Sequence, residues 1–374
     1  MNLSANYMGI SLKNPLVASA SPLTYTLDGV RRLAASGVGA IVMHSLFEEE
    51  LVSDAEHQAR LLEAGSESFA ESLSYFPDTL APKASKHYLG LLERAVNAVE
   101  VPVIASLNGA TPGGWTTHAR DMENAGATAI ELNIHMIPVG PGIDGRGVEE
   151  LHVEILQQVK AVVSVPIAIK LSPYFSSVGE MASRLDKAGA DGIVLFSRFM
   201  HPRIDPESLE VIPSVGLSDP AESRLPQTWV ALLYGRLEAT IVAAGGVEQA
   251  DDVVSYILAG ADAVMTASAL LRHGPGYAEN LLDGLARWMA RKGFDALDQV
   301  RGMLAVQSSS DETTWERTQY VDALRAANAN LQGPWLCDTR GRPAPQTEPA
   351  HHPGGGHRAR RRLGMERPLQ LRRH

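Results

Sequence analysis

The stretch IVAAGGVEQADDVVSYILAGADAVMTASALLRHGP, residues 241–275, decides the fold of this chain. It contains two short apolar runs, 241–244 and 263–266, with a helical segment between them. An apolar run without polar alternation is typical of a parallel strand that is buried on both faces. The stretch therefore predicts two consecutive strand-and-helix units.

Each of these runs leads directly into two small residues: Gly245 and Gly246 after the first, Ala267 and Ser268 after the second. Small side chains at a strand end let backbone N–H groups approach an anion closely, and a following helix adds its positive dipole. In (β/α)8 barrels the loops after strands seven and eight commonly hold a phosphate. The two strand ends therefore predict a phosphate site, provided that six similar units precede them.

A repeated helix-to-strand junction supplies those earlier units. Each copy has a glycine, which suits the left-handed end of a helix, then a small residue and an apolar run. The copies are SGVGAI (36–41), AGATAI (125–130), AGADGI (188–193) and AGADAV (259–264). Reading outward predicts eight strands, near residues 15–19, 39–44, 102–107, 128–134, 165–171, 191–196, 240–244 and 262–266.

Eight such units predict an α/β protein with a (β/α)8 TIM barrel. A doubly wound sheet is the alternative, but SASP (19–22) after the first strand is not the glycine-rich turn of a dinucleotide-binding unit. Residues 2–12 predict a short N-terminal hairpin that closes the bottom of the barrel. Residues 46–88 form a long connection after strand two, and 68–77 is the part that we expect to reach a ligand.

Composition divides the chain into two parts. Residues 338–374 hold nine arginines against three acidic residues, a charge of +6, which leaves −16 for residues 1–337 out of a total of −10. The tail cannot bury a core, and the acidic body would repel nucleic acid. We therefore predict a barrel domain with a C-terminal helical extension over 1–337, a disordered basic tail over 338–374, and no nucleic-acid partner.

Other features predict a soluble cytoplasmic protein with no membrane partner. The chain has no apolar run of about 18 residues and no secretory signal at its start. Its single cysteine, Cys337, excludes an intramolecular disulfide and a cysteine-based metal cluster. The strand ends carry no group of Asp and Glu, so we expect no metal.

The strand ends instead carry amides, hydroxyls, imidazoles and two cations. These groups suit hydrogen bonding to a planar heterocycle that bears carbonyls. Lys170 is the most informative, because an ammonium group in the apolar segment VPIAIKLSPYF (165–175) is costly to bury without an anionic partner. Lys170 could instead extend its ammonium group to solvent.

Several motifs together resemble the dihydroorotate dehydrogenase family, the soluble FMN barrels, over roughly residues 1–305. They are NPLVASAS (14–21), ELNIHMIP (131–138), PIAIKLSPYF (166–175) and residues 243–275. A divergent bacterial branch, usually called dihydroorotate dehydrogenase-like, is similar at further motifs: SLFEEE (45–50), SESFAESLSYFP (66–77), IASLNGATPGGW (104–115), VLFSRF (194–199) and SALLRHGP (268–275).

The resemblance implies an FMN cofactor whose phosphate lies on the backbone of Gly245, Gly246, Ala267 and Ser268. It implies that Lys170 lies beside the N1/O2 edge of the isoalloxazine ring and stabilises reduced, anionic flavin. The remaining cofactor residues that it implies are Ser19, Ala20, His44, Ser45, Asn108, Asn133 and Ser197.

The substrate half of the family pattern is largely replaced. Soluble members use a cysteine as the catalytic base and the membrane-associated class uses a serine, whereas Met136 stands at the position of the cysteine and cannot accept a proton. The orotate-binding loop is replaced by ESLSYFP (71–77), and His44 stands where strand two usually has a lysine.

His135 is the residue that we expect to act as the base, since an imidazole accepts a proton near neutral pH and lies two residues from Asn133. It could also pack in the loop without catalysis. His44, Asn133 and Arg198 are the expected substrate contacts. Arg198 could hold a carboxylate with two hydrogen bonds, or pair with the acidic segment 48–54.

Three functions fit the sequence. The first is an FMN-dependent dehydrogenase that converts dihydroorotate to orotate in pyrimidine biosynthesis, or oxidises a related cyclic amide, with a soluble acceptor such as fumarate. The second is a non-redox phosphate-binding barrel, an isomerase or aldolase, in which Lys170 binds phosphate or forms a Schiff base. The third is a flavin-binding protein without catalysis. The resemblance also suggests a homodimer.

Overall fold

The computed structural model describes residues 1–50, 83–109, 115–136, 138, 142–198, 203–212, 216–306 and 312–330. The chain separates into two compact units, Met1–Glu312 and Thr313–His374. The predicted ligand-facing segment 68–77, Cys337 and the tail 338–374 lie outside the described residues.

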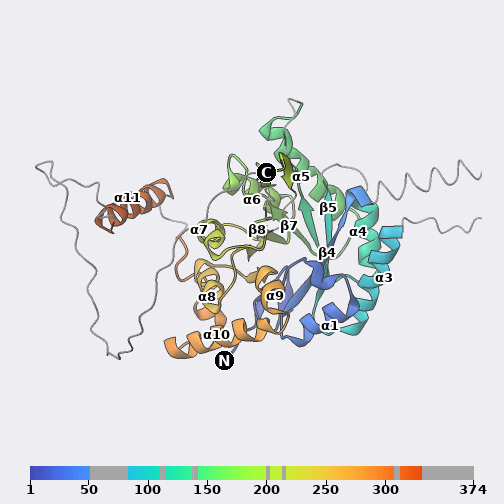
Figure 1. The fold of residues 1–374 in the computed structure, drawn as a ribbon, viewed down its shortest axis with the longest axis horizontal. Coiled ribbons are helices and arrows are strands. Elements are labelled where there is room, and N and C mark those ends of the chain that lie inside the picture. Colours follow the sequence, from blue (N-terminus) through green and yellow to red (C-terminus); the bar gives the residue numbers. More distant parts are fainter. Residues whose placement is uncertain are drawn as a thin grey trace, which may run out of the picture. The chain divides into compact units, whose positions relative to one another are not determined.

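The first unit is a closed barrel of eight parallel strands, as the repeated junctions predict (Figure 1). Its strands are β3 (Leu16–Ala18), β4 (Ala40–Phe47), β5 (Val103–Gly109), β6 (Ala129–Ile134), β7 (Ile167–Leu171), β8 (Gly192–Leu195), β11 (Thr240–Ala244) and β12 (Ala263–Thr266). The barrel closes where β12 pairs with β3, with Met265 opposite Val17.

Helices follow the strands and surround the barrel, as Figure 1 shows. They are α1 (Leu27–Ala35), α3 (Lys83–Ala98), α4 (Trp115–Asn124), α5 (Gly145–Lys160), α6 (Val178–Lys187), α7 (Arg224–Leu233), α8 (Ala250–Ala259), α9 (Ser268–His273) and α10 (Tyr277–Lys292). Short 3-10 helices are η1 (Pro22–Thr24), η3 (Pro220–Ser223) and η4 (Leu297–Gln299), and α11 (Glu312–Asn330) lies almost entirely in the second unit. None of the described helices combines the length and the apolar character needed to cross a membrane.

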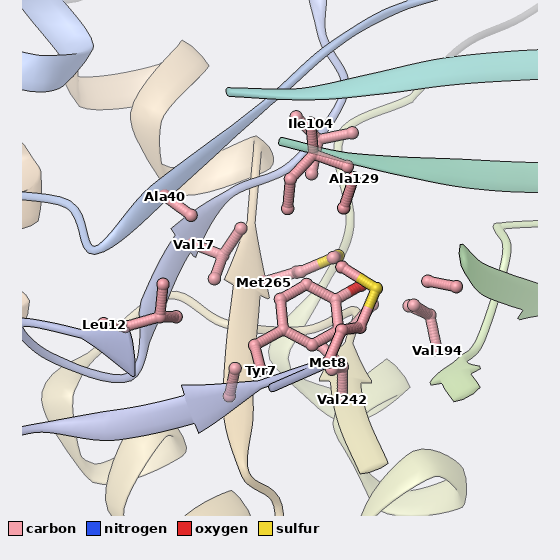
Figure 2. Packing of buried hydrophobic residues seen from close by; sticks show 14 residues of the cluster. Tyr7, Met8, Leu12, Val17, Ala40, Ile104, Ala129, Val194, Val242 and Met265 are labelled. Carbon is pink, nitrogen blue, oxygen red and sulfur yellow. The ribbon is translucent and has the colours of Figure 1, made fainter. Parts of the chain in front are cut away.

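The predicted hairpin closes the bottom of the barrel. Strands β1 (Ala5–Tyr7) and β2 (Ile10–Leu12) pair antiparallel, and the Met8 N–H donates to Thr240 Oγ1 at the start of β11. The ring of Tyr7 is fully buried. Figure 2 shows Tyr7 and Met8 among inward-facing side chains of the strands, which are Val17, Ile104, Val194, Val242 and Met265.

The sequence did not predict a second hairpin. A second hairpin, β9 (Arg203–Asp205) and β10 (Glu210–Ile212), lies between β8 and α7. It is exposed on both faces, so it contributes little to the core whose periodicity reveals the other strands.

The repeated junctions work through backbone geometry and one carboxylate. The four junction glycines, Gly37, Gly126, Gly189 and Gly260, all adopt positive φ, as predicted. In the two copies that continue with aspartate, the carboxylate accepts a hydrogen bond from a backbone N–H of the neighbouring strand that precedes it in the chain. Asp191 accepts from the Ile167 N–H at 2.7 Å, and Asp262 accepts from the Ile241 N–H at 2.8 Å.

Gly260 also makes room for an aromatic ring. A Cβ atom at residue 260 would lie 2.5 Å from Tyr234 Cδ2, and a Cβ atom at residue 302 would lie 2.3 Å from Cε1 of the same ring. Gly235 has a positive φ too, but a Cβ atom there would meet nothing within 4 Å.

We therefore expect Gly260→Ala to lower the free energy of unfolding by more than Gly235→Ala does. Both variants carry the strain of a left-handed alanine, about 1–2 kcal/mol. Gly260→Ala adds overpacking against Tyr234, about 1–3 kcal/mol more. Urea unfolding of the two variants checks this, and equal losses would show that the tyrosine ring moves aside freely.

Candidate active site

A cavity of about 240 Å3 lies at the carboxyl ends of the strands, where barrel enzymes carry their sites. Residues from β3, β7, β8, β11 and β12, or from the loops that follow them, line it. The structure thus brings together seven of the residues predicted from the sequence: Ser19, Ala20, Lys170, Arg198, Gly245, Ala267 and Ser268.

Lys170 does not extend to solvent, since only 11% of its side chain is exposed. Its ammonium group lies 3.3 Å from Ser19 Oγ and 3.4 Å from Glu131 Oε1. Glu131 is buried on β6, with 1% of its side chain exposed. Glu131 is therefore the anionic partner that the burial of Lys170 requires.

The sequence interpretation missed Glu131, although the pattern contained a signal. Glu131 lies two residues after Ala129 and two before Asn133, so all three face the same side of β6, and Ala129 belongs to the barrel core. A carboxylate at such a position is costly unless a cation neutralises it. The sequence therefore allowed the inference that Glu131 pairs with Lys170 on the next strand, β7.

In the part of the chain that the structure describes, three of the buried polar atoms without a hydrogen-bond partner belong to strand β6 or to the hairpin that closes the barrel. They are Asn133 Oδ1, Glu131 Oε2 and Tyr7 Oη. Burial, and then the charge of Glu131, raise the pKa of the Tyr7 hydroxyl, so it stays protonated. Since unpaired buried polar atoms are costly, Asn133 Oδ1 is available to accept a hydrogen bond from a bound N–H or O–H group.

Asn133 lies in a row of polar residues. The strand register places Asn108 of β5 beside Asn133 of β6, and Asn133 beside Lys170 of β7. Two amides and an ammonium group at neighbouring positions can address the carbonyl and N–H groups along one edge of a heterocycle. Contact of these residues with a flavin ring stays a prediction.

The two glycines of the predicted phosphate site have different surroundings. Gly245 lines the cavity, and a Cβ atom there would meet nothing within 4 Å. Gly246 does not line it; a Cβ atom at residue 246 would lie 2.5 Å from the Ser223 nitrogen, so Gly246 allows close packing against the start of α7. Contact between Gly246 and a phosphate stays a prediction.

On the other side, Ala267 and Ser268 line the cavity at the start of α9. Ser268 Oγ accepts a hydrogen bond of 2.9 Å from the Ser218 N–H, which joins the segment 216–218 to the cavity wall. Gly216, Leu217 and Ser218 also line the cavity, but the sequence did not predict them. They follow a hairpin that was itself not predicted, so no strand end marked their position.

His44 and Ser45 lie on β4, outside the residues that line the cavity. His44 Nδ1 lies 3.1 Å from the Thr24 carbonyl oxygen, which can only accept, so in the neutral ring Nδ1 carries the proton and Nε2 keeps a lone pair. Burial lowers the pKa of His44, so the ring is neutral at pH 7. Ser45 Oγ hydrogen-bonds Ser106 Oγ at 2.8 Å.

His135 and Met136 follow β6 and are half-buried. The His135 N–H donates to the Gly109 carbonyl at 3.0 Å, which fixes the backbone beside the end of β5. Neither residue lines the cavity described above. A catalytic role for His135 stays a prediction.

Arg198 pairs with a residue that the sequence interpretation did not consider. Its guanidinium contacts both carboxylate oxygens of Glu222, at 3.3 and 3.2 Å, and donates to the Leu217 carbonyl. Ser197 is held by its N–H, which donates to the Leu171 carbonyl at 2.6 Å. Arg198 thus ties the end of β8 to the segment before α7.

The buried ion pair leads to a stability prediction. Glu131→Gln leaves the Lys170 ammonium group buried without a counter-charge, so we expect the free energy of unfolding to fall by about 3–5 kcal/mol. Glu131→Gln combined with Lys170→Met should recover part of that loss. Denaturant unfolding measures both.

The exposed pair Arg32 and Asp28 provides the control, since Asp28→Asn should change stability by less than about 1 kcal/mol. Equal losses in the free energy of unfolding for Asp28→Asn and Glu131→Gln would show that burial does not make the Glu131–Lys170 pair more costly to break.

Comparison with known proteins agrees with this geometry. The family described as dihydroorotate dehydrogenase matches residues 2–289. A putative dihydroorotate dehydrogenase A (fumarate) of Aeropyrum pernix is 29% identical over 274 residues, covering 66% of this chain and 88% of the relative. The catalytic subunit of dihydroorotate dehydrogenase B (NAD(+)) of Methanocella arvoryzae is 30% identical over 311 residues, covering 81% of this chain and 98% of the relative. Its counterpart in Methanothermobacter thermautotrophicus is 27% identical over 320 residues, covering 80% and 98%.

The family match spans most of the chain and coincides with the barrel and its cavity. It also confirms the resemblance found in the sequence motifs. This chain therefore belongs to the dihydroorotate dehydrogenase family and is an oxidoreductase of the kind that acts on CH–CH bonds.

Proposed function

We propose that this chain binds FMN and oxidises dihydroorotate, or a related cyclic amide, with a soluble electron acceptor. The observation that carries the proposal is the cavity that joins Ser19 and Lys170 to Gly245, Ala267 and Ser268. Lys170 and Ser19 supply a cation and a hydroxyl group, and the small residues Gly245, Ala267 and Ser268 leave space for an anion. The names of two relatives refer to fumarate and to NAD(+), which supports a soluble acceptor.

The residues present fit FMN. Small residues at Gly245, Ala267 and Ser268 leave room for a phosphate, and the unpaired Asn133 Oδ1 offers an acceptor to a ring N–H. Lys170 holds a positive charge where the pyrimidine edge of the ring would gather negative charge. FMN, when bound, supplies the acceptor for a hydride from the substrate.

The second hydrogen of the oxidised bond must leave as a proton. Met136 stands where the soluble family members have a cysteine, and a thioether cannot accept a proton. His135 is the adjacent residue with a group that can, so we assign it as the base. Asn133 and Arg198 are the proposed substrate contacts; because Glu222 already holds Arg198, a substrate carboxylate would compete with that pair.

A flavin-binding protein without turnover is the second candidate, and Met136 is the observation that favours it. Both candidates require FMN. They differ in whether dihydroorotate or a related compound bleaches the bound flavin, so stopped-flow absorbance separates them.

The phosphate position can be tested with a matched pair of variants. Ala267→Asp places a carboxylate in the proposed phosphate site, and Ala267→Asn places a neutral group of the same size there. We expect the Asp variant to bind FMN at least about tenfold more weakly than the Asn variant, because of charge repulsion. Titration of flavin fluorescence measures both affinities.

Two results would contradict this. Equal affinities for the two variants would place the phosphate away from Ala267. Folded wild-type protein that takes up no FMN would remove the proposed function altogether.

The base can be tested by His135→Ala. Loss of a general base typically slows proton transfer by roughly 10²–10⁴-fold, so we expect reduction of bound FMN by substrate to slow by that factor, with FMN affinity unchanged. His118→Ala is the control, because His118 lies on α4 and does not line the cavity. Reduction of His135→Ala at the wild-type rate would exclude His135 as the base.

A further inference from the structure

A second cavity, of about 450 Å3, lies beside the first. Its walls come from the loop after β7, the loop after β8, the helix η3 with the start of α7, and the end of β11. It shares Phe196, Arg198, Ala244 and Gly245 with the first cavity. The shared residues make it a neighbour of the proposed cofactor site, while most of its lining residues are its own.

The second cavity has an apolar floor and rim. Phe196 lies at the shared wall and is only 6% exposed. Tyr174 and Leu225 line it with 64% and 49% of their surface exposed. Large apolar side chains left uncovered around a hollow favour an occupant that removes them from water.

The charges of the second cavity are unequal. Two arginines and one glutamate line it, and Arg198 and Glu222 neutralise each other. Among the described residues, the guanidinium of Arg224 takes part in no ion pair or hydrogen bond. One positive charge therefore remains available at the first turn of α7.

We infer that this second cavity binds a small anion with a flat apolar body, such as an aromatic carboxylate, sulfonate or phosphate ester. The body would pack against Tyr174, Phe196 and Leu225, and the anionic group would pair with Arg224. The volume falls within the roughly 300–1,000 Å3 that is usual for small-molecule sites. The inference does not rest on the proposed function, because it concerns binding and not turnover.

The test uses the fluorescent dye 1-anilinonaphthalene-8-sulfonate, which has an aromatic body and one negative charge. The dye is titrated into the full-length protein, saturated with FMN, and binding is followed by the rise in dye fluorescence. We expect Arg224→Gln to weaken binding about tenfold, in line with the loss of one charge-assisted hydrogen bond. Arg224→Lys should keep most of the affinity, and Leu225→Asp should lose it.

Arg31→Gln is the matched control. It removes an exposed arginine of α1 that does not line the second cavity, so binding should not change. Thermal unfolding of each variant shows whether a loss of binding comes from a loss of fold.

Three results would overturn the inference. Displacement of the dye by excess FMN would place it in the first cavity, as would loss of binding in Ala267→Asp but not in Arg224→Gln. Equal affinity of Arg224→Gln, Arg31→Gln and wild type would place it elsewhere on the surface. Failure of the protein to take up FMN would contradict the proposed function. The dye affinities of wild type and Arg224→Gln would still decide this inference.

Discussion

The pairing of β12 with β3 is the constraint on which the site depends. Met265 pairs with Val17, and just beyond this ladder the Ser19 N–H donates to the Thr266 carbonyl at 3.0 Å. A parallel barrel has no free edge once this last ladder forms. The closure carries Ser19, from the first strand, to the strand ends where Lys170 and Ala267 also lie. Without it, Ser19 and Ala267 would follow strands that are not neighbours in the sheet.

The barrel interior changes its chemistry from one end to the other. At the bottom, Tyr7 and Met8 of the hairpin pack among aliphatic side chains (Figure 2). Toward the top, Glu131 and Lys170 form a buried ion pair. Such a pair contributes little net stability, because desolvation offsets the attraction, but removal of one partner is costly. Glu131 therefore serves mainly to keep the Lys170 ammonium group buried and in place, close to the cavity.

The family resemblance assigns residues of this chain to a flavin, and the proposed function follows that assignment while it leaves the substrate broader than dihydroorotate. Lys170, Asn133 and Gly245 occupy the positions that the family resemblance assigns to the cofactor. The same resemblance places Met136 at the position of the usual base, and Arg198 forms an ion pair with Glu222. A family member with this combination is one in which the cofactor chemistry can persist while the substrate differs, which is why the proposed reaction includes related cyclic amides.

The sequence by itself determined the barrel, because burial on both faces imposes uninterrupted apolar runs, and the helix-to-strand turns require glycine at positive φ in all four copies. It also identified seven of the residues that line the cavity, since strand ends in a parallel barrel meet at one face. The exposed hairpin of β9 and β10 left no such pattern.

Only the tertiary structure decided which groups are partners. Glu131 and Lys170 lie 39 residues apart, and Arg198 and Glu222 lie 24 apart, so neither pair follows from local spacing. Gly246 likewise has the same sequence signature as Gly245, yet one approaches Ser223 and the other opens into the cavity. The physical reason is that periodicity records how deeply a residue is buried, whereas the identity of its neighbour depends on the packing of segments that are distant along the chain.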